Sequence, residues 1–442
     1  MKKILWLVPL AALLAVGCGG GSSSMPWEDE LGGGEEQKPD PTPDGTLVEV
    51  GKPLPVWKKG ELDIHFINTG RGECCYYILP DGTTLLVDAG EVKASHDATD
   101  TSADAAVPQR PNADVRPYIV DARYIKHFAP NGRVFIDYCA PSHFHIDHIG
   151  STGMATETAA AGYKKSGLTA LFDEVPYGKV IDRAYPDYPT DDSHSTIPAM
   201  DGQLRNDWAK FVKWGVAEGK FKAERFEVGK QQITLLNDPK AYAGFKIFNI
   251  CANGFVWSKN GISGSKSGVG NPASCGFHLS YGLFDYIACG DLTSAPQNLV
   301  AYYFRDFIGE GHLDAFKCHH HLSANAWGSQ MQTQKFNPRV IVNQNFYTKQ
   351  PDAGHVNDLM DNKYSFWVKD FFTTNLHPYY HVVNKTVENG IVVNDTVSKI
   401  TGYDGHIVIR VANGGGEFYV YMLDDTDFEY RVKSIHGPYT SK

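Results

Sequence analysis

Three histidines and one aspartate stand within six consecutive residues, and this motif constrains the chain more than any other feature. The motif, His143-x-His145-x-Asp147-His148, follows an apolar run at residues 133–140 that predicts a buried strand. An extended backbone would place His143 and His145 on one side, and a turn would bring Asp147 and His148 to a neighbouring point. Imidazole nitrogens and carboxylate oxygens are ligands that suit Zn²⁺. The motif therefore predicts a metal site, and a surface histidine cluster without metal is the alternative.

The order of these residues resembles the metallo-β-lactamase superfamily, and segments elsewhere in the chain strengthen the resemblance. Residues 62–70 and 82–90 are similar to the opening hairpin of that family, which ends in an aspartate, here Asp88, that braces the metal loop. Residues 280–292 resemble the strand that carries the metal-bridging aspartate, here Asp291.

The last segment, residues 314–323, is similar to the His-His element of the ComEC-type branch, which is named after a competence protein. Leu322 stands where that element has glycine, a departure that bears on the tight turn expected there. Together the segments cover about residues 62–345. The resemblance implies an α/β fold of the four-layer αββα metallo-β-lactamase sandwich type.

The resemblance also implies a ligand set for two metal ions. It assigns His143 and His145 to the first site, Asp147 and His148 to the second, Asp291 to the bridge, and His320 as the last ligand. His321 is then either a substrate contact or a side chain that supports the metal ligands, and a shift of the triplet 319–321 by one residue stays open. No histidine resembles the additional first-site ligand of many members, and His194 lies in a polar loop that is typical of solvent exposure.

Such a donor set predicts hydrolysis. Two divalent ions, zinc or alternatively manganese, lower the pKa of a water molecule and stabilise charge on the attacked group. Asp147 is the predicted catalytic residue, because it can both bind metal and accept a proton. Asn271, Ser274 and Asn325 flank the motifs, either as substrate contacts, for which we select Asn325, or as turn and capping residues.

The ComEC-type resemblance favours a phosphodiester or another phosphate ester as the substrate. A lactamase or lactonase is the alternative within the enzymes. A non-catalytic surface lipoprotein that keeps the fold is the alternative outside them. The net charge of −10 and the lack of a basic stripe give no strong nucleic-acid signal, so we expect a small-molecule or nucleotide-type substrate. The oligomeric state is not specified.

The N-terminus predicts export. Two lysines and a short apolar run precede Cys18, which indicates a lipoprotein signal peptide at residues 1–17 and lipidation of Cys18. Plain secretion is the alternative. Residues 18–58, rich in glycine, proline and acidic residues, predict a flexible tether. The chain is therefore expected to be anchored by lipid to a membrane of the bacterial cell envelope.

Residues 59–442 are expected to form one metallo-β-lactamase-like domain with an insertion at about residues 151–244. Apolar spacing predicts helices at residues 118–128 and, inside the insertion, at residues 204–223. Period-two patterns at residues 405–411 and 417–422 predict strands, which we expect to belong to the second sheet of the sandwich.

Overall fold

The computed structural model describes residues 48–93, 106–200, 202–310, 312–326, 335–361, 368 and 370–441. The predicted signal peptide, the lipidation site Cys18 and the tether up to residue 47 lie outside these residues. Within the described ranges, no helix is long and apolar enough to cross a membrane.

In the described part of the chain, nine strands form the first sheet, in the order β19-β18-β17-β1-β2-β3-β4-β5-β6. They are β1 (Leu62–Phe66), β2 (Cys75–Ile78), β3 (Thr84–Val87), β4 (Ile136–Cys139), β5 (Tyr177–Asp182), β6 (Lys222–Arg225), β17 (His406–Val411), β18 (Glu417–Leu423) and β19 (Val432–Thr440). β1, β2 and β3 form an antiparallel meander, and β3, β4, β5 and β6 run parallel.

The assignment of the tail strands to the second sheet was wrong. β17 pairs antiparallel with β1, with Arg410 directly opposite Asp63, and β18 pairs with β17. Alternation of apolar residues predicts a strand but does not specify which strand lies beside it. The long-range pairing of the tail with β1 therefore completes the first sheet.

Eight of the described strands form the second sheet, in the order β14-β13-β12-β11-β10-β7-β8-β9. They are β7 (Phe245–Ala252), β8 (Phe255–Ser258), β9 (Gly261–Gly264), β10 (Gly276–Tyr281), β11 (Phe284–Ala288), β12 (Ala315–Lys317), β13 (Val340–Asn343) and β14 (Asp370–Thr373). β11 to β14 are parallel, so the loops that follow β11, β12 and β13 leave the same edge of the sheet. A separate hairpin pairs β15 (Lys385–Glu388) with β16 (Ile391–Asp395).

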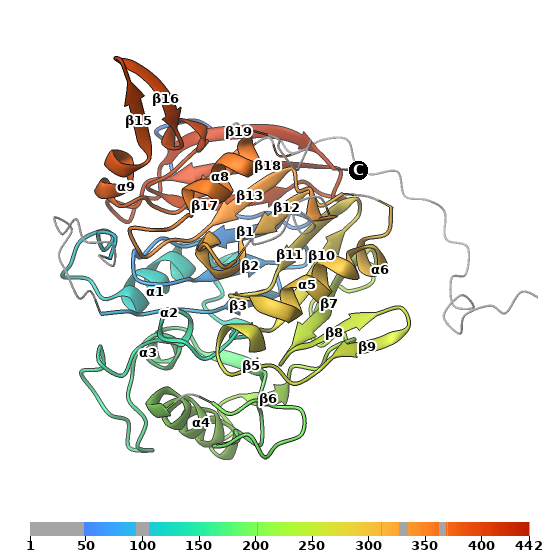
Figure 1. The fold of residues 1–442 in the computed structure, drawn as a ribbon. Helices are drawn as coiled ribbons and strands as arrows, with labels where there is room; N and C mark the ends of the chain where they lie inside the picture. The colour runs from blue at the N-terminus through green and yellow to red at the C-terminus, as the bar shows by residue number, and fades with distance from the viewer. Residues whose placement is uncertain are drawn as a thin grey trace, which may run out of the picture. The chain divides into compact units, whose positions relative to one another are not determined.

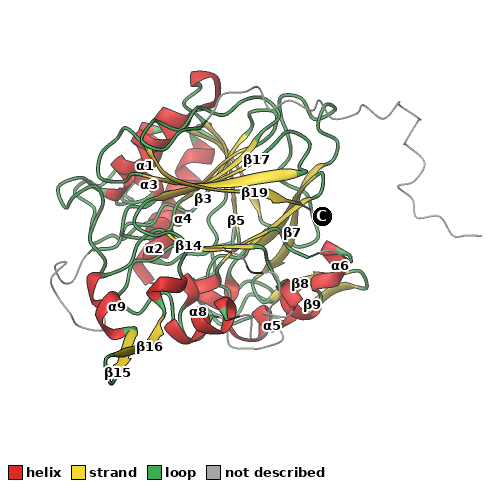
Figure 2. Ribbon diagram, turned by 90° about the horizontal axis from the view of Figure 1, so that it is seen from above, coloured by secondary structure: helices red, strands yellow, loops and turns green. Residues whose placement is uncertain are grey.

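The two sheets pack face to face and helices cover both outer faces (Figure 1). Figure 2 shows α1 and α3 beside one sheet and α5 and α8 beside the other. Three buried apolar layers, one between the sheets and one under each set of helices, hold this arrangement together. The described helices are α1 (Pro117–Phe128), α2 (Ile146–Ile149), α3 (Leu168–Glu174), α4 (Gly202–Ala217), α5 (Ser294–Tyr302), α6 (Phe304–Ile308), α8 (Ala353–Met360) and α9 (Pro378–Val383). The predicted αββα sandwich is therefore confirmed.

Two predicted helices are found close to their expected bounds. α1 begins at Pro117, whose fixed φ suits the first helical turn, and it ends at Phe128, two residues before Pro130. α4 lies in the expected insertion and packs through Trp208, Phe211 and Val212. β5 and β6 continue the first sheet, so this part of the chain belongs to the sandwich itself.

The described end of the predicted tether packs against the sandwich. Leu54 and Trp57 are buried, and Pro53 forms a β-bridge with Arg431 just before β19. The ordered packing therefore begins before residue 59, the predicted start of the domain.

Candidate metal centre

The histidine motif forms a loop and one helical turn after β4. The strand ends at Cys139, and α2 begins at Ile146. Asp88 fixes the loop, because its Oδ1 accepts the backbone N–H of Ser142 at 2.7 Å and its Oδ2 accepts from the Ser142 hydroxyl, also at 2.7 Å. Asp88 Oδ2 also lies 2.8 Å from Nδ1 of His148. These contacts give Asp88 the bracing position that the resemblance implied.

Two glycines let the motif loops approach one another. A Cβ atom on Gly90 would lie 1.9 Å from the carbonyl oxygen of Asp147, and one on Gly290 would lie 2.6 Å from Cβ of Ser142. Gly290 also has a φ of 50°, in the left-handed region. Any larger residue at either position would push the loops apart and with them the side chains of the centre.

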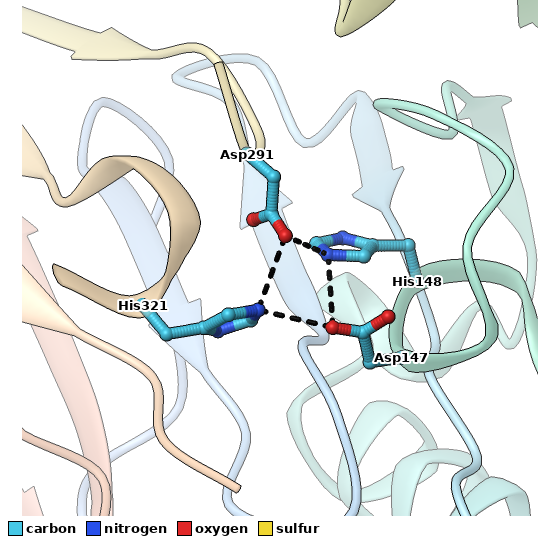
Figure 3. A group of neighbouring side chains, drawn as sticks. All are labelled: Asp147, His148, Asp291 and His321. Atoms are coloured by element: carbon cyan, nitrogen blue, oxygen red, sulfur yellow. Dashed lines mark hydrogen bonds and ion pairs between the residues drawn. The ribbon is translucent and has the colours of Figure 1, made fainter. Parts of the chain in front are cut away.

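Four side chains from the two sheets meet at one point, which we call the central cluster: Asp147, His148, Asp291 and His321 (Figure 3). Nε2 of His321 lies 3.0 Å from Oδ2 of Asp147 and 3.2 Å from Oδ2 of Asp291. Nε2 of His148 lies 3.1 Å from the same oxygen of Asp291. The four ligand atoms all lie within 4.8 Å of one another, a spacing that suits a shared metal ion.

Of the His-x-His pair, His143 lies beside Asp291. Nε2 of His143 is 3.9 Å from Oδ2 of Asp291, and the rings of His143 and His148 are 4.1 Å apart. His145, at the N-terminus of α2, packs edge-on against His143 with ring centroids 4.5 Å apart. The structure thus brings five of the six predicted ligands together, with His320 as the exception.

The donor set fits a divalent metal. His143 Nε2 and Asp291 Oδ1 are buried and have no hydrogen-bond partner within the described residues, which is costly unless a cation or another ligand engages them. Neutral imidazoles and carboxylates are the donors that zinc takes. This centre could hold its ions through the central cluster together with His143 and His145.

The charges of the centre also favour a cation. Burial raises the pKa of Asp147 and of Asp291, but the nearby His148 and His321 imidazoles outweigh burial and hold both pKa values well below the usual range. Burial lowers the pKa of His148 and of His321, but the surrounding carboxylates outweigh it and raise both pKa values well above the usual range. Burial and two neighbouring imidazoles lower the pKa of His143, which keeps it neutral. Positive charge is therefore stabilised between the carboxylates.

His321 lies in the central cluster and His320 does not, which corresponds to the shift of the triplet by one residue that the sequence left open. Asn271 and Asn325 hold His320 to one side. Nε2 of His320 lies 3.1 Å from Nδ2 of Asn271, and its Nδ1 lies 2.8 Å from Oδ1 of Asn325. The backbone explains the shift, because the triplet forms a 3-10 turn with left-handed φ angles at both His320 and His321.

Leu322 makes the turn that the glycine of the ComEC-type element would make. Its φ is 51°, a conformation that costs a branched side chain about 1–2 kcal/mol. Its side chain is fully buried in the layer beneath α5 and α8, which stabilises the fold by about 1.5–3 kcal/mol. Burial thus offsets the strain, and the tight turn forms without glycine.

Glu73 is the functional residue that sequence reasoning missed. It is buried, its Oε1 lies 3.1 Å from Nδ1 of His321, and its Oε2 lies 3.7 Å from Nδ1 of His148. Lys317 donates to Glu73 at 2.8 Å and balances its charge inside the protein. Carboxylates in this position orient metal-binding imidazoles. No local sequence pattern predicts a role for Glu73, because its partners lie in distant segments of the chain.

The remaining candidates lie around the centre. Ser274 Oγ accepts the backbone N–H of Asp291 at 3.2 Å, which makes it a support of the loop. His194 lies in a loop, where its Nδ1 accepts the backbone N–H groups of Thr196 and Ile197. The structure therefore gives the first site no additional histidine from His194.

Sequence comparisons identify no relative: no family model and no curated protein matches the chain. Solved structures of metallo-β-lactamase fold proteins do match. YhfI from Bacillus subtilis has 12% identity and a TM-score of 0.32, over 64% of this chain and 85% of that one. A diphosphatase of the PhnP family has 9% identity and a TM-score of 0.31, over 80% of this chain and 98% of that one.

The diiron β-hydroxylase CmlA from Streptomyces venezuelae has 11% identity and a TM-score of 0.32, over 66% of this chain. The match spans only 45% of the hydroxylase. Similarity at these TM-scores gives no information about the function of this chain.

Proposed function

We propose that this chain is a metal-dependent hydrolase with a metallo-β-lactamase fold and that it acts on a phosphodiester or another phosphate ester. The observation that carries the proposal is the central cluster, in which loops from two sheets bring two carboxylates and two imidazoles within 4.8 Å of one another. With His143 and His145 alongside, the donor set supports two divalent ions. Zinc is the preferred metal and manganese the alternative.

When bound, the two ions would lower the pKa of a water molecule and stabilise negative charge on the attacked group. The side chains of this protein orient the imidazoles that would bind the ions. The backbone carbonyl oxygen of Gln344 accepts from Nδ1 of His321 at 2.8 Å, and Glu73 lies 3.1 Å from the same nitrogen. Asp88 lies 2.8 Å from Nδ1 of His148. These contacts direct both Nε2 atoms into the cluster. This arrangement fixes the ring planes before substrate arrives, so little reorganisation is needed.

Asp147 is the proposed proton acceptor. Its side chain is 10% exposed, whereas those of His148, Asp291 and His321 are at most 1% exposed. Its pKa lies well below the usual range, because the neighbouring imidazoles outweigh the effect of burial, so its carboxylate is ionised. An ionised carboxylate that reaches solvent can take a proton from water and release it.

The similarity of residues 314–323 to the ComEC-type element supports a phosphate ester as the substrate. Beside the cluster, the Nδ2 group of Asn325, whose Oδ1 binds Nδ1 of His320, is a hydrogen-bond donor that suits the oxygen atoms of such an ester. A lactamase or lactonase activity is the alternative. Assays with phosphodiester, β-lactam and lactone chromogens distinguish it from phosphate ester hydrolysis.

We expect the purified chain to contain about two divalent ions and to hydrolyse bis(p-nitrophenyl) phosphate. A chelator should abolish this activity, and Zn²⁺ or Mn²⁺ should restore it. The measurement combines elemental analysis with initial rates on phosphodiester, β-lactam and lactone chromogens. Turnover of only the lactam or lactone would replace the substrate class, and a metal-free chain with activity that resists chelation would end the hydrolase proposal.

We also propose that the protein is a lipoprotein of the cell envelope, anchored through Cys18. The support is the sequence of residues 1–24, with its basic start, short apolar run and cysteine after glycine. Cys18→Ser should move the protein from the membrane fraction to the soluble fraction, whereas Ser23→Ala should leave it membrane-bound. Fractionation and immunoblotting give the readout, and a Cys18→Ser protein that stays with the membrane would contradict the anchor.

A further inference from the structure

A cavity of about 790 Å³ opens directly beside the metal centre. Its wall is built from the turn after β12, residues 347–350 after β13, the start of α8 and the helix α9. The volume lies within the range of about 300–1,000 Å³ that is typical of sites for small organic ligands. The cavity is therefore large enough for a substantial organic group of a substrate.

His320 connects the cavity to the central cluster. Its ring lines the cavity, and its centroid is 5.9 Å from that of His321, which binds into the cluster. Asn325 also lines the cavity, and it uses Oδ1 to hold Nδ1 of His320 at 2.8 Å. No protein acceptor for its Nδ2 is found among the described residues. A ligand that spans the cavity and the cluster would pass this amide.

The wall of the cavity carries aromatic rings and the lysine Lys349. Tyr347, which is 36% exposed, and the half-buried Tyr379 offer ring faces, and the side chain of Lys349 is exposed at the same wall. The acidic residue of the wall, Asp352, is engaged as the N-cap of α8, where its Oδ1 accepts the N–H of His355 at 2.9 Å. Ring faces with a nearby cation suit a planar aromatic group joined to a phosphate.

The polar groups deeper in the wall are already committed to the fold. Gln350 accepts the backbone N–H groups of Phe346 and Tyr347 and donates to Ser323 at 3.2 Å. Asn384 donates to the carbonyl oxygen of Tyr380. These bonds keep the wall in shape around the tyrosine rings, Lys349 and Asn325, the side chains that we expect to contact the ligand.

We propose that this cavity binds the organic group that the substrate retains, and that this group is a nucleoside. The inference rests on the proposed hydrolase function and gives its substrate class: a small nucleotide phosphodiester. The cavity opens beside the cluster, and the net charge of −10 disfavours a long polyanion. The phosphorus atom would lie at the cluster and the base between the tyrosine rings.

Hydrolysis by the full chain carrying Cys18→Ser tests the proposal with two esters that share one leaving group. These are thymidine 5′-(p-nitrophenyl) phosphate and methyl p-nitrophenyl phosphate. We expect kcat/KM to favour the thymidine ester by about 10-fold or more, as for a base stacked on an aromatic side chain. Tyr347→Ala and Tyr379→Leu should bring this ratio toward one, mainly by raising KM. Tyr302→Ala is the matched control, because Tyr302 is 65% exposed on α5 and does not line the cavity.

A binding measurement separates failure of this inference from failure of the hydrolase proposal. Isothermal titration with thymidine 5′-monophosphate and ribose 5-phosphate requires no turnover. We expect tighter binding of the nucleotide, and Tyr347→Ala should remove the difference. Equal binding of both ligands together with equal kcat/KM for both esters would overturn the nucleoside assignment, even in an active hydrolase. Selective nucleotide binding without turnover would support the cavity and refute the hydrolase.

Discussion

Asp147→Asn and Asp291→Asn are each expected to lower hydrolysis by more than about 100-fold, beyond the 10–100-fold that loss of an outer-shell partner typically costs. Both changes keep the size of the side chain and remove one negative charge from a buried cluster that contains two carboxylates. Asp291 faces His143, His148 and His321, so its loss should also lower the metal content.

The two variants should differ in one respect. Asp147→Asn should regain more metal than Asp291→Asn at high Zn²⁺ and stay inactive, because Asp147 is also the proposed proton acceptor. Metal analysis and initial rates across a zinc titration give the comparison. Asp427→Asn, on the surface in an ion pair with Arg431, is the matched control. Normal turnover by Asp147→Asn at normal metal content would remove its catalytic assignment.

Asp63→Asn is expected to destabilise the fold by about 3–5 kcal/mol, the usual cost of breaking a buried ion pair. Asp63 is fully buried, and Arg410 binds it through two contacts, Nε to Oδ1 at 2.8 Å and Nη2 to Oδ2 at 2.6 Å. Without the carboxylate, the Arg410 guanidinium would remain inside the protein, and its acidic partner among the described residues would be Glu61, at 3.5 Å.

Urea denaturation measures this effect as a lower midpoint at constant slope. The double variant Asp63→Leu with Arg410→Met should recover much of the loss, because it removes both charges. Arg431→Met removes the ion pair with Asp427, whose two side chains are 42% and 44% exposed. This change should alter the free energy of unfolding by less than about 1 kcal/mol. A change in Asp63→Asn as small as that of Arg431→Met would show that the pair contributes little.

The same pair predicts a dependence on pH. Burial raises the pKa of Asp63, but Arg410 outweighs it and holds the pKa at about 2, below the ordinary value of 3.8. A depressed pKa stabilises the folded state at pH values above the unfolded pKa. This contribution is therefore present above about pH 4 and is lost as the pH falls through about 2. Asp63→Asn should lose that acid dependence together with its stability.

The sequence predicted those features that depend on local patterns. Apolar runs predict most strands, helical spacing predicts α1 and α4, and the order of the motifs predicts that Asp291 lies beside the histidine motif. Each of these depends on residues that are close in the chain or on a resemblance in their order.

The features that escaped prediction depend on distant contacts or unusual backbone. The pairing of β17 with β1 joins residues at opposite ends of the domain. His321 reaches the central cluster in place of His320 because the backbone makes a left-handed turn there. The sequence does not predict this turn, since Leu322 stands where glycine would indicate it. Glu73 acquires its role only through partners that the fold brings to it.

The central cluster draws Asp147 and His148 from a loop of the first sheet, and Asp291 and His321 from loops of the second. A metal ion held there would crosslink the two sheets of the sandwich through its ligands. Its binding energy would then oppose separation of the sheets, because only the assembled pair offers the full set of ligands. Neither half of the chain carries a complete site, so loss of the ion and loosening of the sandwich are linked events.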